Sequence, residues 1–226
     1  MKKDNATQRR VRTFTMLCKK LDLRKSELIY RFDTFSPEEW TIVRGTPEWS
    51  VGAKRIRGGG PDEPTHGQIF FNKPVKGDVV LEFDAKIVAP SYHDIVWFWN
   101  TDFTAEPWGQ GYLGCLGGWW SNMAGIEKLP DFLVSAIAPS FPVEPGRKYH
   151  VVSGSMGPSH FIAVDGRLVT YFADKNFPSP GRPGHFGFGV YESCVEYSGL
   201  KVYRPFWTDL GERKYVPGTA AKNGII

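Results

Sequence analysis

The sequence has few of the features that mark a disulfide-bonded, metal-binding or membrane-spanning protein. Cys18, Cys115 and Cys194 are its three cysteines, and they are widely spaced with no C-x-x-C pair. This pattern predicts neither a disulfide framework nor a zinc site. No run of about 18 apolar residues is present, so no membrane span is predicted. The opening MKKDNATQRRVRTFTMLCKK lacks the apolar segment of a signal peptide. We therefore expect the cysteines to be reduced and the protein to be cytoplasmic.

A strong excess of charge of one sign is also missing. The chain has 28 basic against 24 acidic residues, a net charge of +4, and the two signs alternate along its length. A nucleic-acid interface would need a concentrated basic patch, so no nucleic-acid partner is expected. No two candidate ligands show the spacing of a metal site, and neither a metal nor a cofactor is predicted.

Glycine, proline and aromatic residues are plentiful and favour a β-protein with many turns. There are 25 glycines and 17 prolines, and 15% of the residues are aromatic. Residues 78–89 (DVVLEFDAKIVA) alternate with a period of two, so that Leu81 and Phe83 face one way and Glu82 and Asp84 face the other. This alternation predicts a strand with one face in a core.

The second half of the chain repeats this pattern. The segment FIAVDGRLVTYF contains an Asp-Gly dipeptide at 165–166, which predicts a tight β-hairpin. In HFGFGVYE, alternation places Phe186 and Phe188 in the core and Gly187 and Gly189 on the opposite face. We expect that glycine-floored face to have room for a ligand or for large aromatic side chains from a neighbouring strand.

About ten to twelve short strands and no convincing helix predict an all-β fold. The expected architecture is two antiparallel sheets packed face to face as a jelly-roll sandwich. We expect a basic N-terminal arm over residues 1–25, the sandwich over 26–205 and an irregular tail over 206–226.

The order of the motifs resembles a known group of proteins. The opening EEWTIVRGTPEWSVGAKRI is followed by GDVVLEFDAKI, HDIVWFWN, GYLGCLGGWW, FIAVDGRLVTYF and GHFGFGVYES. This order is similar to that of the concanavalin-A-like jelly-roll families of bacterial sugar catabolism, in particular the YesU-like group and more distantly the 3-keto-disaccharide hydrolase family. The resemblance covers roughly residues 27–205 and implies a fold and a substrate class. It brings no catalytic motif, and the E-x-D-x-x-E strand of laminarinase-type jelly rolls is missing.

The richest segment for function is residues 92–128, which hold five of the eight tryptophans among glycines and polar residues. Flat apolar rings beside polar groups suit the C–H faces and hydroxyl rims of sugars. The alternative is a tightly packed aromatic core. We expect a concave, aromatic-lined groove whose sugar-binding residues are Trp97, Trp99, Trp119, Trp120, Asn100, His66 and Tyr191.

Three titratable residues near this segment are catalytic candidates. Glu127 follows the aromatic run and, next to the inward Ile126, is expected to face the groove as a general acid. His93 is its expected partner as a base, and Asp102 is the alternative partner. Each also has an ordinary explanation, because a carboxylate beside Lys128 is often solvated and a histidine at a strand end is often only hydrogen-bonded.

Two classes of function follow from these residues. The first is an enzyme that cleaves an oligosaccharide or glycoside by hydrolysis or elimination, which needs one acid and one base. The second is a non-catalytic carbohydrate-binding module or a subunit of a sugar-processing complex. The sequence favours the enzyme, with an oligosaccharide or glycoside as partner, and leaves a homo-oligomer open.

Overall fold

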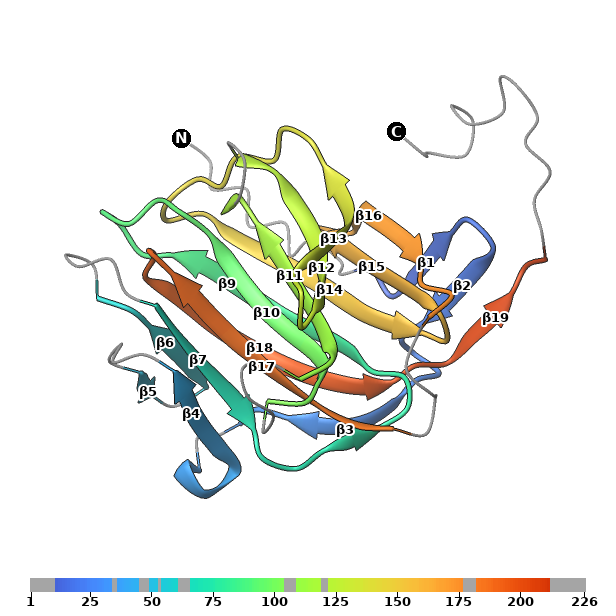
Figure 1. Cartoon of the computed structure of the whole chain (residues 1–226), viewed down its shortest axis with the longest axis horizontal. Coiled ribbons are helices and arrows are strands. Elements are labelled where there is room, and N and C mark those ends of the chain that lie inside the picture. Colours follow the sequence, from blue (N-terminus) through green and yellow to red (C-terminus); the bar gives the residue numbers. More distant parts are fainter. Residues whose placement is uncertain are drawn as a thin grey trace, which may run out of the picture.

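Two antiparallel sheets packed face to face form the body of the protein (Figure 1). The computed structural model describes residues 11–33, 36–44, 49–52, 54–60, 66–103, 109–118, 122–176 and 182–211. Within these ranges it contains strands and one 3-10 turn, η1 (Pro37–Glu39), but no α-helix. The all-β sandwich expected from the sequence is confirmed. None of the helical segments in these ranges is long and apolar enough to cross a membrane.

The sheet that carries the tryptophan strand is called the front sheet here. Its order is β13 (Leu133–Ala138), β12 (Ala124–Leu129), β11 (Gly111–Leu116), β10 (Ile95–Thr101), β17 (Pro183–Tyr191), β7 (His66–Phe71) and β4 (Trp40–Arg44), with β8 (Val75–Lys76) paired to β17. The back sheet has the order β16 (Arg167–Ala173), β15 (Ser159–Val164), β14 (Lys148–Met156), β9 (Val80–Ile87), β18 (Val195–Arg204), β6 (Arg55–Gly58) and β5 (Ser50–Gly52), with β3 (Glu27–Arg31) paired to β18. The face of each sheet that points away from the other is called its outer face.

The core between the sheets is built from the alternating residues that the sequence placed there. Leu81, Phe83, Phe186 and Phe188 are all at most 1% exposed and belong to one apolar cluster between the sheets. Phe83 contacts Phe188 with ring centroids 5.2 Å apart, which joins β9 of the back sheet to β17 of the front sheet. Period-two alternation therefore identified the inner faces of both strands correctly.

The predicted Asp-Gly hairpin is also present. Val164 and Arg167 are paired across the turn between β15 and β16. Asp165 and Gly166 both have positive φ, 50° and 81°. Two successive positive values are what a two-residue type I′ turn requires, which explains the dipeptide.

A third, small sheet joins the first two strands of the described residues to the last one. Its order is β1 (Thr13–Met16), β2 (Lys19–Asp22) and β19 (Trp207–Asp209), seen on the right of Figure 1. Strand residues of the N-terminal segment pack on the outer face of the back sheet through a cluster that includes Phe14, Leu21, Val152 and Phe161. The segments expected as an arm and a tail thus contain strands, because apolar side chains of β1 and β2 cover this outer face.

Candidate functional site

Trp97 and Trp99 lie inside the protein, so the prediction that they line a sugar groove is wrong. Both are 0% exposed and belong to the apolar cluster between the sheets. The Nε1–H of Trp99 donates to His160 Nδ1 at 3.2 Å, a buried contact with the back sheet. Both faces of β10 are apolar, and the indoles lie on the face that points between the sheets, while Val96 and Phe98 belong to a separate apolar cluster.

The outer face of β10 carries Phe98, which packs with aromatic side chains of the same sheet face. The Phe98 and Phe70 ring centroids are 5.0 Å apart, and Phe70 stacks on Phe103 at 4.9 Å. A Cβ on Gly189 would lie 3.0 Å from the Phe98 ring. Neighbouring aromatics therefore fill the glycine-floored face at this point, which was one of the two outcomes expected for it.

At one end of the same face, three of the predicted site residues come together around Tyr191. His66 and Tyr191 are paired across β7 and β17, with ring centroids 4.2 Å apart. The ring of His93, just before β10, lies 5.8 Å from the Tyr191 ring. Tyr191 is 48% exposed. We call these three residues the Tyr191 cluster, an accessible aromatic ring flanked by two imidazoles.

The orientation of His93 is fixed from beneath by its neighbours. His93 Nδ1 lies 3.2 Å from the carbonyl oxygen of Tyr191 and 3.5 Å from Asp94 Oδ2. Because a carbonyl oxygen only accepts, Nδ1 carries a hydrogen in this contact. Asp94 is 4% exposed and accepts a hydrogen bond from Ser193 Oγ at 3.0 Å. The hydrogen bond to Asp94 raises the pKa of His93 above its ordinary value. The sequence singled out His93, but Ser193 lies too far along the chain to be linked to it.

Gln68 adds a polar atom to this face that the sequence did not indicate. It is paired with Gly189, two residues along β7 and β17 from the His66 and Tyr191 pair. Its Oε1 is buried and has no hydrogen-bond partner in the part of the chain that the structure describes. Buried amide oxygens are normally paired, so the unpaired Oε1 of Gln68 is an exception in this part of the sheet.

Glu127 lies on the same outer face on β12, which is two strands from β10 and three strands from β17. Its neighbours across the ladder are Leu113 and Val134, while Ile126 points into the core as expected. Glu127 is 5% exposed, and burial raises the pKa of its carboxyl to about 7. The charged groups that face His93 are Asp94 and Glu192. The structure therefore does not bring Glu127 and His93 into contact as the expected acid–base pair.

Asp102 and Asn100 lie at the opposite end of β10 from His93. The seven-residue strand separates the two ends by about 20 Å at roughly 3.3 Å per residue. Asp102 accepts from Arg182 at 3.1 Å. The Asn100 amide donates to Gly77 O at 3.0 Å and accepts from Ser155 Oγ at 2.9 Å, so its polar atoms bind the protein itself. Trp119 and Trp120 lie outside the described residues.

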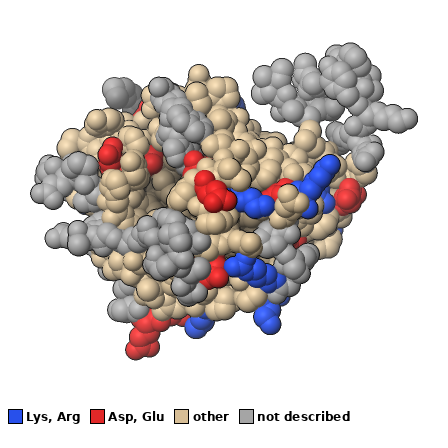
Figure 2. Space-filling view, viewed as in Figure 1, with Lys and Arg blue, Asp and Glu red and all other residues tan. Residues whose placement is uncertain are grey.

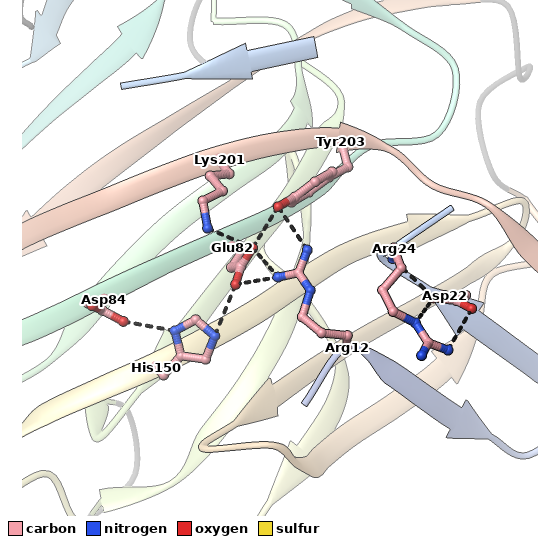
Figure 3. Close-up of polar contacts among 8 residues, drawn as sticks. All are labelled: Arg12, Asp22, Arg24, Glu82, Asp84, His150, Lys201 and Tyr203. Carbon is pink, nitrogen blue, oxygen red and sulfur yellow. Dashed lines mark hydrogen bonds and ion pairs between the residues drawn. The ribbon is translucent and has the colours of Figure 1, made fainter. Parts of the chain in front are cut away.

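A second cluster of charged residues lies on the outer face of the back sheet (Figure 3). Glu82 is fully buried there and accepts two hydrogen bonds from Arg12, at 2.7 and 2.8 Å, and one from Tyr203 at 2.8 Å. His150 lies between the two carboxylates, 3.4 Å from Glu82 and 2.8 Å from Asp84. Burial alone would raise the pKa of Glu82, but the hydrogen bonds from His150, Arg12 and Tyr203 hold it well below its ordinary value.

This Glu82 cluster joins the N-terminal segment to the sheet, because Arg12 and Glu82 are 70 positions apart in the sequence. Its charged groups are paired with one another and largely shielded from solvent, which is typical of a structural ion-pair network. In the described ranges, no group of three or more His, Cys, Asp or Glu side chains is arranged to hold a metal ion.

Comparison with known proteins identifies the fold. No family model matches the chain, and a search of curated proteins found no match. A Bacillus subtilis protein of unknown function with a galectin-like fold superposes with a TM-score of 0.65 at 11% identity, over 79% of this chain and 96% of that one. The carbohydrate binding module CBM66 from Bacillus subtilis gives 0.56 at 20% identity, over 73% and 95%.

The exoplasmic/lumenal domain of VIP36, in its Ca2+/Man3GlcNAc-bound form, gives a TM-score of 0.59 at 11% identity, over 87% of this chain and 92% of that one. Since no family model matches, the resemblance to the YesU-like group and to the 3-keto-disaccharide hydrolases stays a prediction. At these identities the similarity concerns the architecture, and the chain has the galectin-like, concanavalin-A-like sandwich fold.

Proposed function

We propose that this protein binds a carbohydrate on the outer face of the front sheet, at the Tyr191 cluster. The observation that carries the proposal is the exposed Tyr191 ring between His66 and His93. An accessible aromatic face stacks on the C–H face of a sugar, and imidazole nitrogens at its rim bind hydroxyls. The His93 side chain is 33% exposed, so its ring is accessible on the same face.

The proteins with a similar fold support this choice of ligand. They include one described as a carbohydrate binding module and one whose structure holds Man3GlcNAc. The ligand class also agrees with the resemblance to jelly-roll proteins of sugar catabolism. An oligosaccharide or glycoside is therefore the proposed partner.

The test is the affinity of the Tyr191→Ala variant for an oligosaccharide selected on a glycan array. We expect at least about a fivefold loss, since aromatic stacking contributes roughly 1 kcal/mol or more. Phe206→Ala is the matched control, because Phe206 is an exposed aromatic, 43% accessible, that lies outside the cluster. Equal affinity of the wild type and Tyr191→Ala would remove the cluster from the binding site.

A second candidate function is cleavage of the bound glycoside in the cytoplasm. The observation in its favour is Glu127, whose pKa of about 7 keeps much of the carboxyl protonated at neutral pH, as a general acid requires. Glu127→Gln keeps the shape and removes the titrating proton. If the protein is an enzyme of this type, turnover should fall about a hundredfold with little change in binding. Unchanged turnover of that variant would exclude Glu127 as the acid.

A further inference from the structure

The strand β13 forms one edge of the front sheet and is apolar for an edge strand. Its sequence LVSAIA has no charged residue and no proline, and within the described ranges no strand pairs with its free side. Leu133, Val134 and Ile137 are 58%, 40% and 44% exposed, and Phe132 in the preceding turn is 38% exposed. Proteins usually protect such an edge with a charge or a proline, because its free N–H and C=O groups attract another strand. This edge has neither, and its apolar side chains are open to a partner.

A bulge in the middle of β13 decides which way its side chains point. Ser135 is the extra residue, left without a partner where the ladder to β12 shifts its register. Val134 lies opposite Glu127, and Ile137 lies opposite Gly125. Those two residues of β12 are two positions apart and share the outer face, so Val134 and Ile137 share it too. Without the bulge, side chains three positions apart would point to opposite faces.

The two end residues of β13, Leu133 and Ala138, point to the inner side. They lie opposite Lys128 and Ala124 in the ladder. Ala138 packs against the apolar cluster between the sheets, and Lys128 reaches Asp174, which follows β16 of the back sheet. From either end, the strand therefore begins with one inner residue and then one outer residue. Its facing pattern reads the same in both directions around the bulge.

We propose that β13 pairs antiparallel with β13 of a second copy of this chain, about a two-fold axis through the middle of the strand. In an antiparallel pair, residues directly opposite each other point to the same face. Setting Val134 opposite Ile137, and Leu133 opposite Ala138, meets this condition at both ends of the strand. A bulge often turns an edge away from pairing. Here each bulge faces the bulge of the other copy, so neither strand has a residue in excess.

The distribution of charge favours a second copy as the partner. A two-fold interface brings each patch against itself, so a charged strand would meet like charges, and β13 has none. Asp131 is the nearest charged residue along the chain, and this register sets it opposite Ser140 of the second copy. The two Asp131 carboxylates then lie about 30 Å apart, at roughly 3.3 Å per residue. In the view of Figure 2, uncharged surface predominates in the upper part, where Figure 1 shows the yellow β12–β13 hairpin.

The pairing joins the two front sheets into one continuous sheet. Because the axis is perpendicular to the sheet, the outer faces of both copies, and with them the two Tyr191 clusters, lie on the same side. A standard interface uses roughly 20–30 residues from each partner, and β13 with its turn supplies far fewer. We therefore expect a dimer that dissociates on dilution.

The experiment is sedimentation velocity of the full chain from about 1 to about 200 μM, a range that brackets micromolar dissociation constants. We expect the mass of the wild type to rise from 25.5 kDa toward twice that value. Val134→Lys and Ile137→Glu should each weaken the dimer at least about tenfold, because each sets a charge opposite an apolar side chain. Ile42→Lys is the matched control and should dimerise as the wild type does, since Ile42 is 52% exposed on β4, the other edge strand of the front sheet.

A mixture of the two variants tests the register itself. When Val134→Lys protein pairs with Ile137→Glu protein, the introduced lysine lies opposite the introduced glutamate, and the other outer pair is unchanged. We expect the mixture to form dimers that neither variant forms alone. Such a rescue also shows that both variants are folded.

Three results would overturn the proposal. A wild type that stays at 25.5 kDa over the whole range does not pair with itself. A dimer that survives both Val134→Lys and Ile137→Glu uses another surface. Loss of the dimer in both variants without rescue in the mixture means that position 134 does not lie opposite position 137 of the second copy.

Discussion

Gly114 on β11 leaves open the space that the indole of Trp97 occupies on the neighbouring strand β10. The two residues are paired in the ladder, and a Cβ on Gly114 would lie 2.5 Å from Trp97 Cε2. Glycine is thus needed next to the tryptophan for a reason of packing. At this pair, tryptophan and glycine occur together because the small residue makes room for the large buried ring.

Replacing Gly114 by alanine should destabilise the fold. The added methyl overlaps the rigid Trp97 ring and its own strand cannot move away, so we expect a loss of about 1–3 kcal/mol in the free energy of unfolding. Urea denaturation measures it. Gly60→Ala is the control, because nothing lies within 4 Å of a Cβ at Gly60. Equal stability of the two variants would contradict the close packing described here.

Trp97→Ala should reduce stability and leave carbohydrate affinity unchanged. Trp97 is fully buried between the sheets, and truncation of a buried tryptophan costs roughly 3–5 kcal/mol. Its ring does not reach the outer face, so the folded fraction should bind sugar as the wild type does. Thermal unfolding measures the stability of the variant, and titration calorimetry on the same samples measures its affinity for the sugar. A large loss of affinity at full stability would restore Trp97 to a binding role.

Glu82→Gln should lower the free energy of unfolding at neutral pH, and it should lower it much less in acid. The pKa of Glu82 in the folded protein is below its unfolded value, so its contribution is present above about pH 4.5 and is lost as the pH falls toward the folded value. Breaking a buried ion pair costs roughly 3 kcal/mol or more, so we expect a loss of that size at pH 7.

The measurement is urea denaturation of the wild type and Glu82→Gln between about pH 3 and pH 7, a range that brackets the unfolded pKa. The pH is changed in steps of about one unit. Glu27→Gln is the control, because Glu27 pairs with Arg204 at 2.6 Å but is 62% exposed. An exposed pair contributes about 0–1 kcal/mol. A pH-independent difference between the wild type and Glu82→Gln would contradict the assignment.

Glu127→Gln should show the opposite pH dependence. Its pKa is raised from 4.5 to about 7 in the folded protein, so the folded state holds a proton that the unfolded chain releases. Stability of the wild type relative to Glu127→Gln should therefore fall as the pH rises from 4.5 to about 7, by up to about 3 kcal/mol. Chemical denaturation of both proteins across this range measures the difference. Parallel stability curves would show that Glu127 titrates normally.

Local sequence was sufficient for the strands and for much of the core. Alternation in β9 and β17 assigned Leu81, Phe83, Phe186 and Phe188 to the inner faces, because one side of each strand is plainly more apolar or bulkier than the other. The Asp165–Gly166 turn followed from the positive φ that its backbone needs. The sequence also singled out His66, His93 and Tyr191, although it gave no reason to place them around one ring.

Only the tertiary structure decided which face of β10 points between the two sheets. Alternation places Trp97 and Trp99 on one face of the strand and Val96 and Phe98 on the other. It cannot say which of two apolar faces lies in the core between the sheets. The space for the Trp97 indole comes from Gly114 on another strand. The same limit applies to long-range pairs. Arg12 meets Glu82 70 positions away, and Ser193 supports Asp94 99 positions away. Such contacts depend on how the strands are ordered in the sheets, and the period of a single strand carries no information about that order.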